Sequence, residues 1–401
     1  MKKATLFILC CLTTVKLFSQ ESKPGDIRND SLIQPALQRV NQDSIFNTIA
    51  TLQDYGSRFM IADNRRGIAD YLQGRFSNFG IDSVRIDSFE CHTQHASGLD
   101  TITWQYNIVA TIQGDDLRDE VIVLGAHYDS YSSTSDPMLL APGADDNGSG
   151  IAVCLETARI LAEMAFQPHR TFEIVCFAAE EYMLSGISGS EHYANEASVA
   201  GRNIVLMINN DMVGYDDGSW TVCLSNYPSC SEETNLICTV ISEYTTLNTC
   251  LWPSWWQPFA DVEPFMDHGY KAVYIEESSF NPFYHTDNDL LQNMSVDFCT
   301  EVAKISLGSL LYNDLTVGTD ETFREDQEVF VFPNPASNTI NIGGITGKIK
   351  HIQIIDSYGR VVLSQSPDGQ IKIDISLLSN GFYLLSVRTE NTLYTSKFLK
   401  N

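Results

Sequence analysis

The sequence predicts an α/β domain with a mixed, mostly parallel central sheet flanked by helices, followed by a small C-terminal all-β sandwich module. Between about residues 38 and 315, short apolar runs rich in β-branched residues alternate with segments whose apolar residues recur at helical spacing. After residue 315 only strand-like alternation continues. The chain has 401 residues, 43% of them hydrophobic, which is sufficient for more than one core.

Residues 1–19 are predicted to be a secretory signal peptide. Lys2 and Lys3 precede an apolar stretch too short to span a bilayer, and polar residues follow near Ser19. Leu9 is not the small residue that lipid-modifying cleavage before Cys10 prefers, which argues against a lipoprotein. We expect residues 20–37 to lead into the first domain, and no later run is long enough for a membrane helix.

The elements expected along the first domain place all candidate chemical residues at one edge of a sheet. Strands are predicted at 120–130, 170–181, 203–215 and 270–278, and helices at 149–165 and 295–314. The candidate residues lie where these strands end or in the loops that follow, as is typical of sites in open α/β sheets. The α/β domain at 38–315 is followed by an acidic linker at 316–328 and by the β-module at 329–401, with a hairpin turn at 357–359.

Charge and cysteine content narrow the class of protein. The net charge of −26, from 51 acidic and 25 basic side chains, excludes a general affinity for nucleic acid. Two cysteines lie in the signal peptide, and the absence of a CxxC pair elsewhere argues against a zinc–thiolate site. In an exported protein one or two disulfides are expected, with pairing left open, among Cys223, Cys230, Cys238 and Cys250. Cys154 and Cys176 lie in apolar runs and are expected to be buried free thiols.

Five segments carry potential metal ligands. They contain His127 with Asp129, Asp145 with Asp146, Glu180 with Glu181, Asp211, and His285. Each residue alone is more often a cap or a turn residue, and the adjacent Glu pair alone could equally begin a helix. Together they provide what two bridged zinc ions need, which is about two imidazoles, two or three carboxylates and an unligated base. Imidazole with carboxylate suits zinc better than calcium.

These five motifs, in this order, resemble the co-catalytic dizinc aminopeptidases, which include secreted bacterial leucyl aminopeptidases and are related to glutamate carboxypeptidases and glutaminyl cyclases. The resemblance covers about residues 38–315 and implies a zinc exopeptidase-like fold. It also implies two Zn²⁺ per chain. The implied ligands, with Asp146 bridging the ions, are His127 and Asp211 on one zinc, and Glu181 and His285 on the other.

The same resemblance implies roles for the residues around these ligands. A cis peptide bond would join Asp146 to Asn147. Asp129 would accept a hydrogen bond from the far nitrogen of His127 and fix its tautomer. In the family pattern the first glutamate of the pair stays off the metal, so Glu180 is the expected general base.

Candidate substrate residues lie in three places. In "FADVEPF" (259–265), Asp261 matches the family pattern, whereas Val262 stands where the family commonly has a histidine. Tyr284 precedes a ligand and is a candidate to stabilise the oxyanion. An aromatic loop is a candidate wall for an apolar pocket, with packing at the domain edge as the alternative, and contains Trp252, Trp255 and Trp256.

The C-terminal module resembles the sorting domains of the bacterial type IX secretion system, through "FPNPASNTI", "GFY" (381–383) and "KFLK" (397–400). This implies contact with the outer-membrane secretion machinery, then release or attachment to the cell surface. An adhesive or carbohydrate-binding sandwich is the alternative, but the module shows no obvious aromatic platform.

The predicted function is therefore a secreted zinc aminopeptidase acting on the N-terminal residues of peptides. A glutaminyl cyclase, a carboxypeptidase or a non-catalytic export module with a structural metal site are the alternatives. The complete ligand set argues against the cyclase, and Glu180 against a structural site. A carboxypeptidase needs basic residues near the motifs, whereas Arg170 and Arg202 are expected at the opposite end of their strands.

Overall fold

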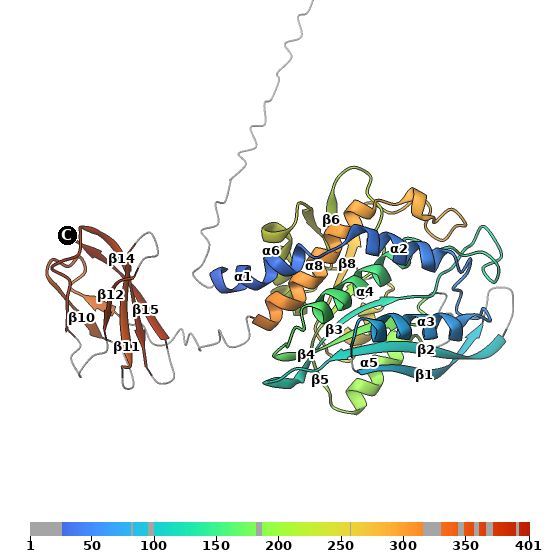
Figure 1. The fold of residues 1–401 in the computed structure, drawn as a ribbon, viewed down its shortest axis with the longest axis horizontal. Coiled ribbons are helices and arrows are strands. Elements are labelled where there is room, and N and C mark those ends of the chain that lie inside the picture. Colours follow the sequence, from blue (N-terminus) through green and yellow to red (C-terminus); the bar gives the residue numbers. More distant parts are fainter. Residues whose placement is uncertain are drawn as a thin grey trace, which may run out of the picture.

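The computed structural model describes residues 26–81, 83–94, 100–181, 187–256, 258–315, 330–343, 349–356, 361–365, 372–389 and 393–401. The expected signal peptide, the linker at 316–328 and the turn at 357–359 lie outside these residues. An eight-stranded sheet with its helices accounts for the chain up to Leu315, and two smaller sheets are formed from Phe330 onward (Figure 1).

The large sheet is mixed, with a parallel centre. Its strands are β1 (Ser83–Gln94), β2 (Asp100–Ile112), β3 (Leu117–His127), β4 (Arg170–Phe177), β5 (Asn203–Asn210), β6 (Thr221–Leu224), β7 (Asn248–Leu251) and β8 (Ala272–Glu277). They are arranged in the order β1-β2-β4-β3-β5-β8-β6-β7. Strands β4, β3, β5 and β8 are parallel, whereas β1 and β2 form an antiparallel edge and β6 runs antiparallel to β8. The predicted fold class is confirmed.

Helices cover both faces of this sheet (Figure 1). The larger core includes residues from α1 (Asp26–Leu37), α2 (Gln42–Gln53), α3 (Arg65–Asn78), α4 (Gly148–Glu163), α6 (Ser231–Tyr244) and α8 (Val296–Leu315). The smaller core, on the other face, includes residues from α5 (Gly189–Val199) and α7 (Val262–Asp267). Strand β3 contributes Leu124 and Ala126 to the first core and Val121 and Val123 to the second. This alternation explains why its sequence is apolar throughout.

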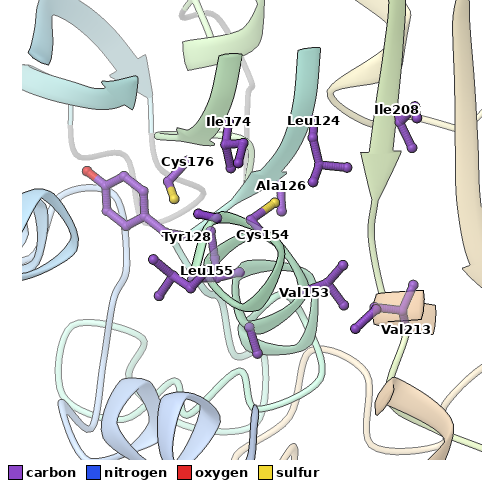
Figure 2. Packing of buried hydrophobic residues seen from close by; sticks show 14 of the residues in the cluster. Leu124, Ala126, Tyr128, Val153, Cys154, Leu155, Ile174, Cys176, Ile208 and Val213 are labelled. Carbon is purple, nitrogen blue, oxygen red and sulfur yellow. The ribbon is translucent and has the colours of Figure 1, made fainter. Parts of the chain in front are cut away.

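Helix α4 begins directly after the segment that carries Asp145 and Asp146. The side chain of Asn147 caps it by accepting a hydrogen bond from the backbone N–H of Gly150 at 2.9 Å. Figure 2 shows Val153, Cys154 and Leu155 of this helix packed among residues from the sheet, including Cys176 of β4. Cys154 and Cys176 are both buried and free, as predicted. The short 3₁₀ helices are η1 (Pro228–Cys230) and η2 (Leu291–Asn293).

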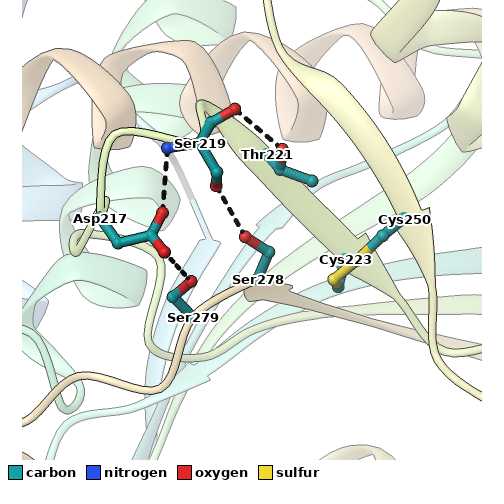
Figure 3. Close-up of a disulfide and its surroundings, with 7 residues drawn as sticks. All are labelled: Asp217, Ser219, Thr221, Cys223, Cys250, Ser278 and Ser279. Atoms are coloured by element: carbon teal, nitrogen blue, oxygen red, sulfur yellow. Dashed lines mark hydrogen bonds between the residues drawn. A yellow bond between two sulfur atoms is a disulfide. The ribbon is translucent and has the colours of Figure 1, made fainter. Parts of the chain in front are cut away.

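One disulfide forms among the four clustered cysteines. Cys223 of β6 pairs with Cys250 of β7, directly across the parallel strand pair (Figure 3). Cys230 and Cys238 are free. The disulfide therefore fastens β7, which forms one edge of the large sheet, to its only neighbour in the strand order.

The C-terminal module is a small antiparallel β-structure with its own core. Strands β9 (Phe330–Phe332), β10 (Thr339–Gly343) and β13 (Lys372–Asp374) form one sheet. The other sheet contains β11 (His351–Asp356), β12 (Val361–Gln365), β14 (Gly381–Arg388) and β15 (Leu393–Lys400). Residues from both sheets share one buried cluster, including Ile340, Ile354, Leu385 and Phe398. Among the described residues, no helix is long and apolar enough to cross a bilayer.

Candidate metal centre

The predicted ligands come from separate elements that end at the same edge of the large sheet. His127 is the last residue of β3, Glu180 and Glu181 follow β4, and Asp211 follows β5. Because these three strands are parallel neighbours, their carboxyl ends coincide. Asp146, in the loop before α4, and His285, in the loop after β8, complete the set.

Asp146 lies between the two histidines. The Nε2 atom of His127 is 3.4 Å from Asp146 Oδ1 and 3.3 Å from Asp211 Oδ1. The Nε2 atom of His285 is 3.3 Å from Asp146 Oδ2 and 2.8 Å from Glu181 Oε2. Each carboxylate oxygen of Asp146 therefore faces a different imidazole, which is the arrangement expected of a bridging ligand.

Several atoms of this cluster are buried without a hydrogen-bond partner, namely Asp146 Oδ2, Glu181 Oε1 and His285 Nε2. Buried polar atoms are normally paired, because an unpaired one costs free energy. The ligand atoms of His127, Asp146 and Asp211 lie within 4.8 Å of one another, and so do those of Asp146, Glu181 and His285. The residues thus fit two adjacent divalent cations that share Asp146.

The family model for peptidase family M28 matches residues 107–309, which is half of the chain and includes every one of these ligands. The chain belongs to peptidase family M28. A second family model, described as a secretion system C-terminal sorting domain, matches residues 330–401. Both resemblances inferred from the sequence are confirmed.

Relatives of this M28 peptidase include proteins named as aminopeptidases. It is 27% identical to a probable leucine aminopeptidase of Arthroderma otae, over 71% of this chain and 76% of that protein. It is also 27% identical to leucine aminopeptidase 1 of Coccidioides posadasii, over 72% and 75% of the two chains. The expected enzyme class, a metallo-aminopeptidase, agrees with the family and with these relatives.

Solved structures show the same fold. LapB from Legionella pneumophila superposes with a TM-score of 0.60 at 23% identity, covering 74% of this chain and 78% of that one. A zinc aminopeptidase from Bacillus subtilis superposes with a TM-score of 0.54 at 15% identity, covering 67% and 94%. At these identities the likeness concerns the fold of the M28 domain.

Asp129 connects three of the predicted site residues. Its Oδ1 accepts a hydrogen bond from the backbone N–H of Glu180 at 3.1 Å, and its Oδ2 accepts one from Glu181 at 3.0 Å. The same Oδ1 is 3.5 Å from His127 Nδ1, on the side of the ring that faces away from the ligand cluster. The carboxylate of Asp129 therefore positions the Glu pair and lies next to the ring nitrogen of His127 that faces away from the other candidate ligands.

The loop before α4 is held by residues that the sequence analysis did not select. The carboxylate of Asp289 accepts hydrogen bonds from the backbone N–H groups of Asp145 and Asp146 at 2.9 and 3.0 Å. Arg58 is fully buried, and its guanidinium donates to the carbonyl oxygens of Tyr128, Leu52, Pro142 and Gly143. The peptide bond between Asp146 and Asn147 is cis, as the family resemblance implied.

Burial and mutual charge alter the acidity of the ligands when no cation is bound. Burial and the neighbouring charge of Asp146 raise the pKa of Glu181 to about 8. Although burial opposes its charged form, the neighbouring carboxylates of Asp146 and Glu181 raise the pKa of His285 to about 10. Burial, opposed by the charge of His127, raises the pKa of Glu180 well above its usual value. Without a cation, bound protons thus reduce the repulsion between these buried carboxylates, and bound cations would replace the protons.

The candidate substrate residues lie in different surroundings. The ring of Tyr284 stacks on the ligand His285, with 3.7 Å between centroids. Trp256 stacks on Trp252 and contacts Tyr274, whereas Trp255 is 80% exposed. Asp261 precedes α7 and is completely buried, and burial raises its pKa to about 7 against the charge of His127.

Proposed function

We propose that this M28 peptidase is a secreted aminopeptidase that uses two zinc ions to hydrolyse the N-terminal residues of peptides. The observation that carries the proposal is the placement of Asp146, whose two oxygens lie 3.4 and 3.3 Å from the Nε2 atoms of His127 and His285. Asp211 on one side and Glu181 on the other supply a carboxylate for each cation. Imidazole with carboxylate is the donor set that zinc favours.

Glu180 is the proposed general base. Zinc ions bound here would lower the pKa of a water molecule to roughly 7 and polarise the peptide carbonyl. The side chain of Glu180 is 11% exposed, and its Oε2 lies 3.8 Å from His127 Nε2, so it faces the centre. From this position it would take a proton from the attacking water and then give this proton to the leaving amine. Glu181, 2.8 Å from His285, is left as the ligand.

The charges around the centre favour a substrate with a free amino group. The charges of Asp211 and Asp261 raise the pKa of Glu180. Asp211 would be paired with a bound cation, so Glu180 and Asp261 are the carboxylates left to attract a positively charged N-terminus. A carboxypeptidase would instead need a cation for the substrate carboxylate. Arg58 has a buried guanidinium that could in principle serve this purpose, but its donors are all directed at backbone carbonyls.

The arginines on neighbouring strands also favour an aminopeptidase. Arg170 is the first residue of β4 and pairs with Glu120 at 2.7 Å. Arg202 precedes β5 and pairs with Glu173 at 2.8 Å. Both therefore lie at the end of the sheet opposite to the metal ligands, as predicted from the sequence.

The test is zinc content together with hydrolysis of a panel of amino-acyl chromogenic amides by the wild type and by Glu180→Gln. The variant is expected to retain its zinc and lose about 10²- to 10⁴-fold in kcat, because the amide cannot accept the proton. Glu181→Gln is the matched control, since removing a ligand should reduce zinc content as well. Full zinc without amidase activity in the wild type would refute the proposal, and N-terminal glutamine cyclisation would then be assayed.

The remaining roles follow from the same proposal. We assign Tyr284, Trp255, Trp256 and Asp261 to the substrate side of the centre. Export is supported by the sorting-domain match at residues 330–401, which would engage the outer-membrane secretion machinery. The mature enzyme would then be released or held at the cell surface, after loss of the predicted signal peptide.

A further inference from the structure

A second cluster of metal-binding side chains lies between β1 and α5, and it shares no residue with the metal centre. It consists of Asp87, His192 and Glu196, whose ligand atoms are within 4.8 Å of one another. The Nε2 atom of His192 is buried and has no hydrogen-bond partner, although the side chain as a whole is 18% exposed. Asp87 Oδ1 is 3.5 Å from this nitrogen.

The separation of 3.5 Å is informative. It is too long for a good hydrogen bond between a ring nitrogen and a carboxylate. Two ligand atoms on one tetrahedral zinc ion, each about 2.0–2.1 Å from it, are about 3.4 Å apart. Similar separations of 3.3 to 3.4 Å occur between the imidazoles and carboxylates of the M28 centre.

The three side chains are held by ordered structure. The ring of Phe89, two residues after Asp87 on the same face of β1, stacks on the imidazole of His192 at 4.6 Å and 14°. His192 and Glu196 are four residues apart on α5, so they share one face of the helix. The ring nitrogen is thus fixed in a direction toward Asp87, and the helix places Glu196 beside it.

The charge of Asp87 and the space beside it also suit a cation. Its second oxygen, Oδ2, is 3.3 Å from Arg85 Nη1, which leaves Oδ1 for the cluster. Asp87 and Glu196 also line a surface pocket of about 180 Å³, whose other lining residues include Arg85 and Arg202, each paired with a carboxylate. Water in this pocket could complete the coordination left open by three protein ligands.

We propose that Asp87, His192 and Glu196 bind a divalent cation of the zinc type, separate from the catalytic centre, and that this ion fastens α5 to the edge strand β1. An imidazole with two carboxylates is a donor set that zinc favours over calcium. The ion would act on a helix that begins close to the catalytic base. Gly189 of α5 donates its N–H to Ala178 O at 2.7 Å, and Asn107 bonds to both of these residues.

The chain offers a matched control for this site. His169 lies 3.4 Å from both Asp115 and Asp116 and forms a cluster of similar composition. Its side chain is 41% exposed, and the ring nitrogen is directed at carboxylates on the solvent side. No site is inferred there, so His169→Gln controls for the loss of a surface histidine.

The test compares zinc content and thermal unfolding of the full chain as the wild type, His192→Gln, Glu196→Gln and His169→Gln. After dialysis against a zinc buffer, the wild type and His169→Gln should hold one more zinc per chain than His192→Gln. Zinc added above the content of the catalytic centre should raise the Tm of the wild type but not of the His192 and Glu196 variants. Amidase activity should be equal in all four proteins.

Equal zinc content in the wild type and His192→Gln would overturn the proposal, and so would equal Tm responses to zinc. The measured quantity is a difference between variants, so it does not depend on how many ions the catalytic centre holds. The result could therefore still be interpreted if the proposed peptidase mechanism proved wrong. Because Glu196 is exposed, Glu196→Gln should fold normally even if the His192 variant does not.

Discussion

At the scale of single residues, Asp129 shows how a side chain that is not itself a proposed ligand can support the proposed metal centre. It accepts hydrogen bonds from the backbone of both Glu180 and Glu181 and lies 3.5 Å from His127. The carboxylate can accept from both backbone N–H groups because each of its oxygens is an acceptor, and the backbone carbonyl oxygen of the same residue lies 3.2 Å from Nδ1 of His127. An amide at this position would direct an N–H₂ group toward one of the donors.

Asp129→Asn is therefore expected to weaken zinc binding about 10- to 100-fold, which is the usual range for the loss of a partner behind a ligating histidine. The measurement is competition for zinc with a chelator of known affinity. Asp136→Asn, on the exposed loop at 131–140, is the matched control and should behave as wild type. An unchanged zinc affinity in Asp129→Asn would show that Asp129 does not support the ligands.

The candidate ligands and Asp129 could be proposed from the sequence, whereas the contacts of Arg58 and Asp289 that hold the loop before α4 could not. His127, Glu181 and Asp211 each follow an apolar strand-like run, so the motif and its place in the fold are visible together. Arg58 bonds to carbonyls 70 to 85 residues away in the chain, at Tyr128, Pro142 and Gly143. No local pattern marks such a contact, because only the fold creates it.

At the scale of elements, the predicted strands were placed correctly but extended too far. The runs at 120–130, 170–181 and 203–215 correspond to strands that end at His127, Phe177 and Asn210. The residues that follow are loops, yet most of them are buried, because they lie over the metal centre. Buried apolar residues such as Ala178, Ala179 and Val213 continue past the strand ends, so hydrophobicity alone does not reveal where the strand ends.

The edge strand β7 depends on a covalent bond. Three of its four residues are exposed, so little apolar burial holds it to β6. The disulfide between Cys223 and Cys250 joins the two strands across a sequence separation of 27. The sequence analysis left the pairing open because spacing alone does not decide between the four cysteines.

Replacing both cysteines in Cys223→Ser/Cys250→Ser is expected to lower the free energy of unfolding by about 3 kcal/mol, mainly by releasing a constraint on the unfolded chain. Denaturant unfolding under oxidising conditions measures this difference. Cys238→Ser, which removes a free thiol, should behave as wild type. If reduction of the wild type did not reproduce the loss seen in the double variant, the disulfide would not be its cause.

At the scale of the whole molecule, composition and periodicity were sufficient for the fold class but not for the complete sheet. The antiparallel strands β1 and β2 were not predicted. Strand β1 has few buried residues, and most of its side chains, such as Arg85 and Asp87, are exposed or half-exposed. It therefore lacks the continuous apolar run of the central strands. Its partner in space, α5, is more than 90 residues away in sequence, which hid the cluster that we propose as a second cation site.

The stability of the M28 domain should depend on pH more strongly without bound zinc than with it. In the cation-free fold the pKa of Glu181 is about 8 and that of His285 about 10, against ordinary values of 4.5 and 6.5. Both are raised, so between these limits the folded protein holds more protons than the unfolded chain. This contribution to stability is complete below the ordinary pKa values and is lost as pH rises through the raised ones.

We therefore expect the Tm of chelator-treated protein to fall as pH is raised from about 6 to about 9. The zinc-loaded protein should show a weaker fall, since its ligands are already deprotonated and paired with cations. Differential scanning calorimetry at several pH values measures both curves. His285→Gln, chelated in the same way, should lose part of the slope because one of the two proton-binding groups is gone. A chelated wild type whose Tm rose over this range would contradict the prediction, because it would mean that the carboxylates are ionised without a cation and that burial does not raise their pKa.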